Sequence, residues 1–219
     1  MREVAEGVWQ ITTRVLTLTI NTYLASDVLF DTGGRQMARR MLDELRGRSI
    51  TSMALTHVHP DHQGGAHFIC EALGIPLACP AGEVDRMEGR EPMAVSTWAL
   101  RLADWVFTGP SHHVARSLRE GDTVADFTVY DTPGHSRGHV VYFRERDGLA
   151  IVGDVMNGMN LLTGIPGLCR PPDLVNEEPR KVNDAIRKVA ELRPRIVCFG
   201  HGPVLRDPDR LQRFAAGLV

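Results

Sequence analysis

The densest group of reactive side chains in this sequence lies in the stretch LTHVHPDHQGG, which begins at residue 55. It places His57, His59, Asp61 and His62 almost side by side in the chain. Ordinary surface or core histidines would not explain this spacing, because burying several polar groups together costs free energy unless something binds them. Neutral imidazoles and carboxylates are the usual ligands of zinc and other divalent first-row metals. The stretch therefore predicts a metal site.

Three later segments each end an expected strand in a ligand-type residue beside glycine: His135 in TPGH, Asp154 in VGD and His201 in FGHG. Together with the first four residues they exceed what one tetrahedral ion can use. Two metals roughly 3.5 to 4 Å apart that share a carboxylate would use them all. Two such cations lower the pKa of a shared water, so that a bridging hydroxide can attack an ester, thioester, amide or phosphate centre. Asp61 could also orient this nucleophile or take its proton.

The elements that must position these residues follow from the hydrophobic pattern. We expect strands over 8–14, 20–26 and 27–34 with a tight turn at Asp27, then an amphipathic helix over 35–46. The apolar run SMALTH predicts a strand that ends at His57, which places the metal-type residues at its carboxyl end, where α/β folds commonly build ligand sites. A helix should follow from Gly64 to Leu73, and we expect His67 on it to pack or face solvent rather than bind a ligand.

The segment 81–119 shows no strand pattern, and Ser96 is expected to cap a helix carrying Trp98, Leu102 and Trp105. These residues are interpreted as core, or alternatively as a lid over a pocket. We assign no ligand role to the histidines of the loop GPSHH, residues 109–113. Strands are then expected over 122–135, 139–146, 149–155 and 195–202, with a turn at 147–148, a helix from Pro179 and a last helix capped by Asp207.

Composition limits the class of protein. At 219 residues and 24.2 kDa the chain fits a single domain over 1–219, with a possible lid insert at 81–119. A net charge of −2 gives no reason to expect nucleic acid or membrane as partner, so a small-molecule substrate is favoured. No apolar run or signal pattern predicts a membrane span or secretion, which favours the cytoplasm. The four separated cysteines are expected to be buried free thiols, and the oligomeric state is not defined.

The ordered set THVHPDH, TPGHSRGH, VGD and FGHG, with DTGG before it, resembles the metallo-β-lactamase-fold hydrolases over most of the chain. The resemblance implies an α+β fold, the four-layer αββα sandwich, in which two mixed β-sheets are flanked by helices. The resemblance also implies that the protein binds two divalent metal ions. The first would be bound by His57, His59 and His135, and the second by Asp61, His62 and His201. Asp154 would bridge the two ions.

Two residues beyond the ligands are given supporting roles. Asp31 in FDTGG is expected to hydrogen-bond a ligand histidine, or else to cap the glycine turn that follows it. His139 is expected to pack beside the ligands rather than to bind metal. Zinc is the favoured metal, although iron and manganese accept the same ligands.

Within that family the sequence favours a stand-alone dinuclear hydrolase of a small ester, lactone or thioester. The commonest β-lactamases carry arginine where this chain has His62, glyoxalase II enzymes carry an added helical domain, and related nucleases would show a basic face. Met156, Met159 and Arg170 are candidate substrate contacts. The alternatives are a persulfide dioxygenase with a single iron, a β-lactamase-like or phosphodiester hydrolase, and a non-catalytic binding member.

Overall fold

The computed structural model describes residues 1–92 and 105–218. Their contacts divide the chain into two compact units. Unit 1 comprises Met1–Thr13 and Ile20–Leu118, and unit 2 comprises Arg14–Thr19 and Arg119–Val219. In the described part, no helix is long and apolar enough to cross a membrane. The expectations of a single domain and of a cytoplasmic location stay predictions.

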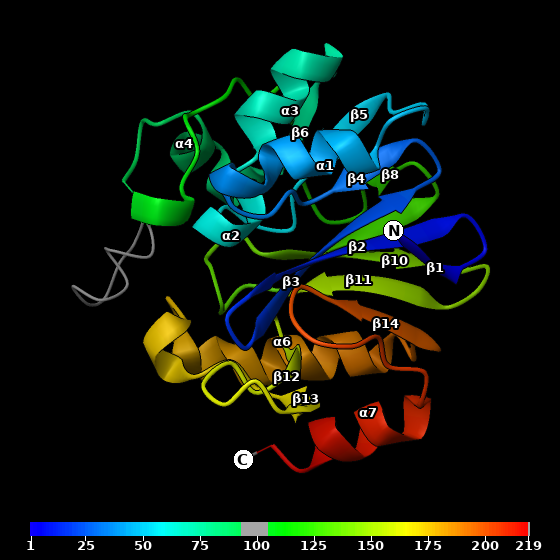
Figure 1. Cartoon of the computed structure of the whole chain (residues 1–219). Helices are drawn as coiled ribbons and strands as arrows, with labels where there is room; N and C mark the ends of the chain where they lie inside the picture. Colours follow the sequence, from blue (N-terminus) through cyan, green and yellow to red (C-terminus); the bar gives the residue numbers. More distant parts are fainter. Residues whose placement is uncertain (93–104, 219) are drawn as a thin grey trace. The chain divides into compact units, whose positions relative to one another are not determined.

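Unit 1 is built on a seven-stranded sheet, whose strands follow one another in space as they do in the sequence (Figure 1). The first four strands form antiparallel hairpins, whereas β4 to β7 run parallel to one another. The sheet is therefore mixed, as expected. The strands are β1 (Arg2–Ala5), β2 (Val8–Val15), β3 (Leu18–Ala25), β4 (Val28–Phe30), β5 (Ser52–Ala54), β6 (Leu77–Pro80) and β7 (Arg116–Leu118).

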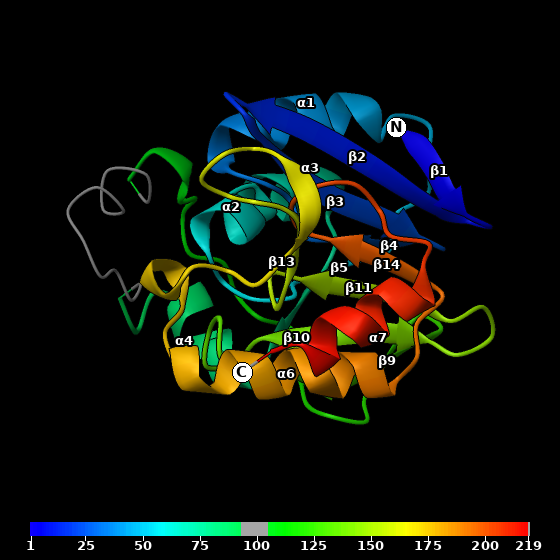
Figure 2. The ribbon, with the colours of Figure 1, turned by 90° about the horizontal axis from the view of Figure 1, so that it is seen from below.

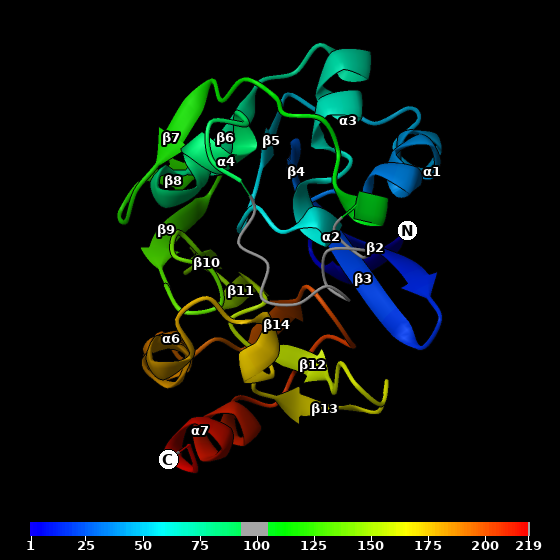
Figure 3. The ribbon, with the colours of Figure 1, turned by 90° about the vertical axis from the view of Figure 1, so that its left-hand side faces the viewer.

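The helices of unit 1 cover the parallel part of this sheet (Figure 3). Met41 and Leu45 pack with Ile69, Met53 and Leu77 in one buried cluster. Burial of such side chains stabilises the unit by roughly 1.5 to 3 kcal/mol each. The helical elements are the 3-10 turns η1 (Arg35–Met37) and η2 (Ala81–Glu83), and the helices α1 (Ala38–Glu44), α2 (Pro60–Gln63), α3 (Ala66–Leu73) and α4 (Val84–Met87).

Unit 2 is built on a five-stranded sheet in the order β14-β11-β10-β9-β8. Neighbouring strands pair antiparallel except β11 with β14, which are parallel, so this sheet is mixed too. A separate hairpin carries two more strands. The strands are β8 (Thr123–Val124), β9 (Phe127–Asp131), β10 (Val140–Arg144), β11 (Leu149–Gly153), β12 (Asn157–Met159), β13 (Pro166–Cys169) and β14 (Ile196–Phe199).

Two helices of unit 2, α6 (Pro179–Glu191) and α7 (Pro208–Ala216), lie side by side next to this sheet (Figure 2). A 3-10 turn, η3 (Asp173–Val175), precedes α6. Val182, Ile186 and Val189 of α6 are buried, which confirms the apolar stripe. Asp207 caps α7, because its side chain accepts a hydrogen bond from the backbone N–H of Arg210 at 2.9 Å.

Two expectations for the segment 81–119 are wrong. It does contain a strand, β7, which was missed because three residues pairing with β6 are too few to show a period. Trp105 is not core, since it is 70% exposed and its ring lies 5.5 Å from the Arg35 guanidinium. The expected cap Ser96, with Trp98 and Leu102, lies outside the described residues.

The cysteines follow the expectation in the main. All four are free thiols, with Cys70, Cys79 and Cys198 buried and Cys169 half-buried. Burial raises the pKa of the Cys70 thiol to about 12 and that of Cys79 well above its ordinary value. Thiols held in this neutral form are poor nucleophiles, so these two residues contribute packing rather than chemistry.

Candidate metal centre

The first group of candidate ligands, in unit 1, lies on the loop that leaves β5 and on the short helix α2. His59 precedes the helix in extended conformation, and Pro60 occupies its first turn, where the missing N–H costs nothing. The turn brings the imidazole rings together: the His57 ring centroid lies 4.6 Å from that of His59 and 4.2 Å from that of His62. His57 and His62 are fully buried, whereas His59 and Asp61 are half-buried.

Asp31, at the end of β4, holds two of these histidines in place. Its Oδ1 accepts the backbone N–H of Thr56 at 2.8 Å, and its Oδ2 accepts the Thr56 hydroxyl at 2.8 Å. Oδ2 also lies 2.9 Å from Nδ1 of His62. The expected contact between Asp31 and a histidine of the predicted ligand set is therefore confirmed.

The Thr56 hydroxyl extends this chain of hydrogen bonds to His57, whose Nδ1 lies 3.0 Å away. Because the hydroxyl proton is directed at the Asp31 carboxylate, the hydroxyl oxygen accepts from Nδ1–H of His57. The same carboxylate fixes the proton of His62 on Nδ1. Both rings are thereby set to offer Nε2 as the lone-pair nitrogen, which is how a carboxylate supports a metal-ligating histidine.

In unit 2, three further ligand-type residues converge at the ends of their elements. Asp154 follows β11, His201 follows β14, and His135 lies in the loop between β9 and β10. The Asp154 Oδ2 lies 3.0 Å from Nε2 of His201 and 3.7 Å from Nε2 of His135. All three side chains are at most 5% exposed.

The two histidines of unit 2 are oriented in the same way as those of unit 1. Nδ1 of His135 lies 2.9 Å from Oδ1 of Asn176, and Nδ1 of His201 lies 2.7 Å from the backbone carbonyl of Thr19. The Asn176 oxygen is the group facing His135, because its amide nitrogen donates to the Pro171 carbonyl. Each Nδ1 therefore carries the proton, and each Nε2 offers a lone pair.

His139 supports this arrangement without facing it as a ligand. Its Nε2 accepts the backbone N–H of Asp154 at 3.1 Å, so its proton sits on Nδ1, 2.8 Å from the Thr132 hydroxyl. A ring nitrogen already engaged by a backbone N–H cannot also bind a cation. The structure therefore confirms the expected supporting position of His139.

The supporting partners Thr56, Asn176 and Thr19 were not anticipated. A threonine directly before a ligand histidine is a weak signal in retrospect. Asn176 is 41 residues from His135 in sequence, and Thr19 acts through its backbone carbonyl across 182 residues. No pattern in the sequence marks either residue.

The three candidate substrate contacts have structural surroundings of their own. Met156 is fully buried in the unit 2 core, and the buried Met159 thioether lies 3.4 Å from the Thr19 hydroxyl. The Arg170 guanidinium donates to the side chains of Asn183 and Asp173 and to backbone carbonyls. Packing therefore explains the positions of Met156 and Met159, and hydrogen bonds to neighbouring segments explain that of Arg170. Substrate contact by these three residues stays a prediction.

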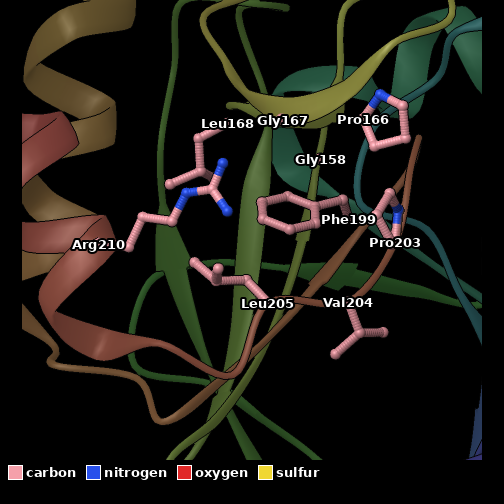
Figure 4. Close-up of a pocket in the computed structure, with 9 residues that line it drawn as sticks. All are labelled: Gly158, Pro166, Gly167, Leu168, Phe199, Pro203, Val204, Leu205 and Arg210. Atoms are coloured by element: carbon pink, nitrogen blue, oxygen red, sulfur yellow. The ribbon is translucent and has the colours of Figure 1, made fainter.

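A small cavity of about 120 Å³ opens on unit 2 beside the segment that follows His201. Figure 4 shows the Phe199 ring in it, facing the side chains of Arg210 and Leu168. Pockets that enclose a drug-sized ligand measure roughly 300 to 1,000 Å³. This cavity is too small for such a molecule.

Comparison with known proteins identifies the family of the chain. The family model described as the metallo-beta-lactamase superfamily matches residues 17–201. The chain is 26% identical over 221 residues to "Probable metallo-hydrolase YybB" of Bacillus subtilis (strain 168), covering 97% of this chain and 96% of that protein. It is 28% identical over 158 residues to a hydroxyacylglutathione hydrolase of Erythrobacter litoralis (strain HTCC2594), covering 70% of this chain and 49% of that protein. The chain thus spans about half the length of this second relative.

Solved structures share the fold. The crystal structure of TTHA1623 in a di-iron-bound form is similar with a TM-score of 0.70 and 26% identity, covering 94% of this chain and 97% of that one. The BLEG-1 B3 metallo-beta-lactamase is similar with a TM-score of 0.71 and 25% identity, covering 96% of this chain and all 100% of that one. The expected α+β fold, with two mixed sheets and flanking helices, is confirmed.

These findings define a metal-dependent hydrolase. The chain belongs to the metallo-beta-lactamase superfamily, whose model covers both sets of ligand-type residues.

Proposed function

We propose that this protein is a dinuclear metal-dependent hydrolase of small esters, lactones or thioesters. The observation that carries the proposal is the common state of four histidines. In His57, His62, His135 and His201 an oxygen acceptor faces Nδ1, which places the ring proton on Nδ1 and the lone pair on Nε2. Neutral imidazoles presented this way, together with buried Asp154, fit divalent cations better than any role as surface or core residues.

The resemblance to the family supports one division of the ligands between two ions. His57, His59 and His135 would hold one ion, Asp61, His62 and His201 the other, and the Asp154 carboxylate would serve both. When bound, two such ions lower the pKa of the water they share and polarise the substrate oxygen. Zinc is the favoured metal. Iron is the alternative, because a similar protein, TTHA1623, was solved in a di-iron-bound form.

The protein's own side chains then have three tasks. Asp31, Thr56, Asn176 and the Thr19 carbonyl accept the Nδ1 protons and so orient the imidazole rings. His139 accepts a hydrogen bond from the backbone N–H of Asp154 and so positions the residue whose carboxylate would bridge the two ions. Half-buried Asp61 can accept a proton from the attacking water and return it to the leaving group, as a general acid–base group does.

The substrate class follows from the relatives as a proposal. Several are named as hydroxyacylglutathione hydrolases, which act on an acyl group carried by glutathione. Thioesters are therefore the first class to test. The decisive experiment pairs elemental analysis of protein purified without added metal with hydrolysis of lactones, thioesters, a β-lactam and a phosphodiester.

The outcomes separate the alternatives. Near two metals per chain with turnover of an ester, lactone or thioester would support the proposal. Near one iron, with oxygen consumption on glutathione persulfide and no hydrolysis, would replace it with the dioxygenase function. Turnover of only the β-lactam or phosphodiester would change the substrate class, and full metal loading without any turnover would indicate a binding protein.

Asp154→Ala is the sharpest single change. We expect it to remove two-metal binding and hydrolysis together, because the carboxylate serves both ions. Asp209→Ala, on the exposed first turn of α7, is the matched control and should leave both unchanged. A variant Asp154→Ala that keeps its metal and its activity would refute the bridging role.

A further inference from the structure

A second group of metal-type side chains lies in unit 1, apart from the segment 57–62. It consists of His67 and Glu71 on α3 and His112 on the loop before β7, and one ligand atom from each lies within 4.8 Å of the others. His67 and Glu71 are four residues apart on a helix, so they project from one face. The loop is held where it is by a hydrogen bond from the His112 N–H to the Met87 carbonyl at 3.0 Å.

The distance between His112 and Glu71 does not suit a direct hydrogen bond. Nδ1 of His112 lies 3.7 Å from Oε1 of Glu71, which is too long for one. Two ligand atoms on one tetrahedral zinc, each at about 2.1 Å from the ion, lie about 3.4 Å apart. The rings of His67 and His112 meet edge to face, with centroids 5.4 Å apart.

The ring of His67 supplies an independent observation. Its Nδ1 is buried and has no hydrogen-bond partner among the described residues. Such an atom loses its contact with water and receives nothing in return. A bound metal ion that accepts the lone pair of this nitrogen would remove this cost.

The electrostatics of His112 favour the neutral form that metal binding needs. Burial lowers its pKa, and the neighbouring His67 lowers it further, while Glu71 opposes both. The net effect is a pKa below the ordinary value of histidine. A lowered pKa favours the neutral imidazole, which is the form that binds a metal ion.

We propose that His67, Glu71 and His112 form a second, peripheral metal site that binds one divalent first-row transition ion such as Zn²⁺. Two imidazoles and one carboxylate are a common three-ligand set for this ion and leave a position for water. The bound ion would link α3 to the loop that precedes β7. This revises the expectation from the sequence that neither His67 nor His112 is a ligand, since only the fold brings them together.

The test is a calorimetric titration of the full-length protein with Zn²⁺, comparing the wild type with His112→Ala. We expect the wild type to bind one more equivalent than this variant. His113→Ala is the matched control, because His113 is the next residue, its side chain is 83% exposed, and it contacts Glu88 instead. Glu71→Gln should weaken the same equivalent by at least about tenfold.

A second readout identifies the ligands directly. With Cu²⁺ added as a probe, electron paramagnetic resonance should show coupling to two imidazole nitrogens at this site in the wild type and to one in His67→Ala. Equal Zn²⁺ stoichiometry in wild type and His112→Ala would overturn the proposal, as would loss of the same equivalent in His113→Ala. Because the comparison counts one equivalent between matched proteins, it is independent of how many ions the residues 57–62 bind.

Discussion

At the scale of single residues, Asp31 is the group on which the orientation of the unit 1 histidines depends. It adopts a left-handed backbone conformation with φ of 59°, which is costly for a residue other than glycine. The cost is offset because this geometry lets one carboxylate accept from Thr56 twice and from His62 once. The sequence suggested Asp31 as a partner of a ligand, but not that it serves two histidines.

Asp31→Ala should therefore weaken metal binding more than it weakens the fold. Removing a group that supports a ligand costs about 10- to 100-fold in metal affinity. Competition with a chelator of known affinity measures this. Asp43→Ala, an exposed aspartate on α1, serves as the control and should bind metal as the wild type does. Unchanged affinity in Asp31→Ala would show that metal binding does not depend on the hydrogen bonds of Asp31 to Thr56 and His62.

The residue scale also shows where sequence interpretation stops. Residue type and order are enough to nominate His57 or Asp154, because few other functions use those types so close to strand ends. They are not enough to find Asn176, since an asparagine in a loop has many ordinary uses. They also missed the group around His67, because two of its members are separated from the third by about 40 residues of chain.

At the scale of elements, the passage from β5 into α2 and α3 is set by close backbone approaches. A Cβ atom added at Gly64 would lie 2.5 Å from the Pro60 carbonyl and 2.6 Å from the Arg35 backbone nitrogen, and closer still to the Phe107 carbonyl. Real side chains do not tolerate such contacts, and rigid backbone cannot yield. Glycine at this position is what lets α2 end and α3 begin so close to η1.

Gly64→Ala should accordingly destabilise the protein by about 3 kcal/mol, the upper end of the range for overpacking. It should also reduce metal content, because His62 lies two residues away on the displaced turn. Urea unfolding and elemental analysis provide the two measurements. Gly167→Ala is the control, since an added Cβ there meets nothing closer than 4.0 Å. Equal stability of the two variants would mean that the turn at Gly64 shifts freely.

The hairpin from β10 to β11 carries a charge pair that makes its stability depend on pH. Buried Arg144 donates to both carboxylate oxygens of Asp147, at 3.0 and 2.8 Å. Burial tends to raise the pKa of Asp147, but the hydrogen bonds and charge of Arg144 outweigh it and hold this pKa below its usual value. A carboxyl with a lowered folded pKa stabilises the fold above its unfolded pKa and loses that effect as pH falls through the folded value.

Asp147→Asn should then cost about 1.5 kcal/mol of unfolding free energy at pH 7, as loss of a charged hydrogen-bond partner does. The difference from wild type should stay constant down to roughly pH 4, the ordinary pKa of aspartate, and shrink below it. Urea unfolding at several pH values tests this. Asp184→Asn removes a pair with Arg187 whose aspartate is 80% exposed, and should show almost no cost at any pH. A gap for Asp147→Asn that persists undiminished at pH 3 would contradict the assignment.

Strands and helices were predictable to the extent that they are long and buried. The strands β6, β11 and β14 are recognisable as continuous apolar runs, and α6 is recognisable by its apolar stripe at helical spacing. The strand β1 and the helix α2 could not be recognised in this way, because each has only four residues and so shows no repeat. Their positions are set by tertiary contacts rather than by local preference.

At the scale of the whole molecule, binding of metal ions adds directly to the stability of the folded chain. Ligands that bind only the folded state stabilise it by about 4 kcal/mol at a thousandfold excess over Kd. For a protein of this size, each kcal/mol shifts Tm by about 2 to 4 °C. Removal of metal by a chelator should therefore lower Tm by about 10 °C.

Differential scanning calorimetry with and without chelator checks this expectation, and readdition of Zn²⁺ should restore the original Tm. The variant Asp154→Ala should show a much smaller chelator effect, since it is expected to lack the bridging ligand. If full removal of metal leaves Tm unchanged, the ligands are already well satisfied without ions, which would count against the proposed centre.

The assignment of residues 14–19 to unit 2 was not visible in the sequence. The segment Arg14–Thr19 contains the end of β2, the turn and the start of β3, yet its contacts assign it to unit 2. There the Thr19 carbonyl and hydroxyl accept from His201 and from the N–H of Gly202, across more than 180 residues. Pairings at that separation leave no local trace in the sequence.

This assignment has a consequence for synthesis of the chain on the ribosome. Residues 14–19 emerge long before His201 and Gly202, to which Thr19 is hydrogen-bonded. Unit 1 has all of its residues outside the ribosome soon after Leu118 has been translated, but unit 2 must wait until His201 and Gly202 have been translated. Unit 1 can therefore fold while later residues are still being translated, whereas unit 2 cannot. A gene split after the codon for Leu118 would leave residues 14–19 of unit 2 on the fragment that carries unit 1.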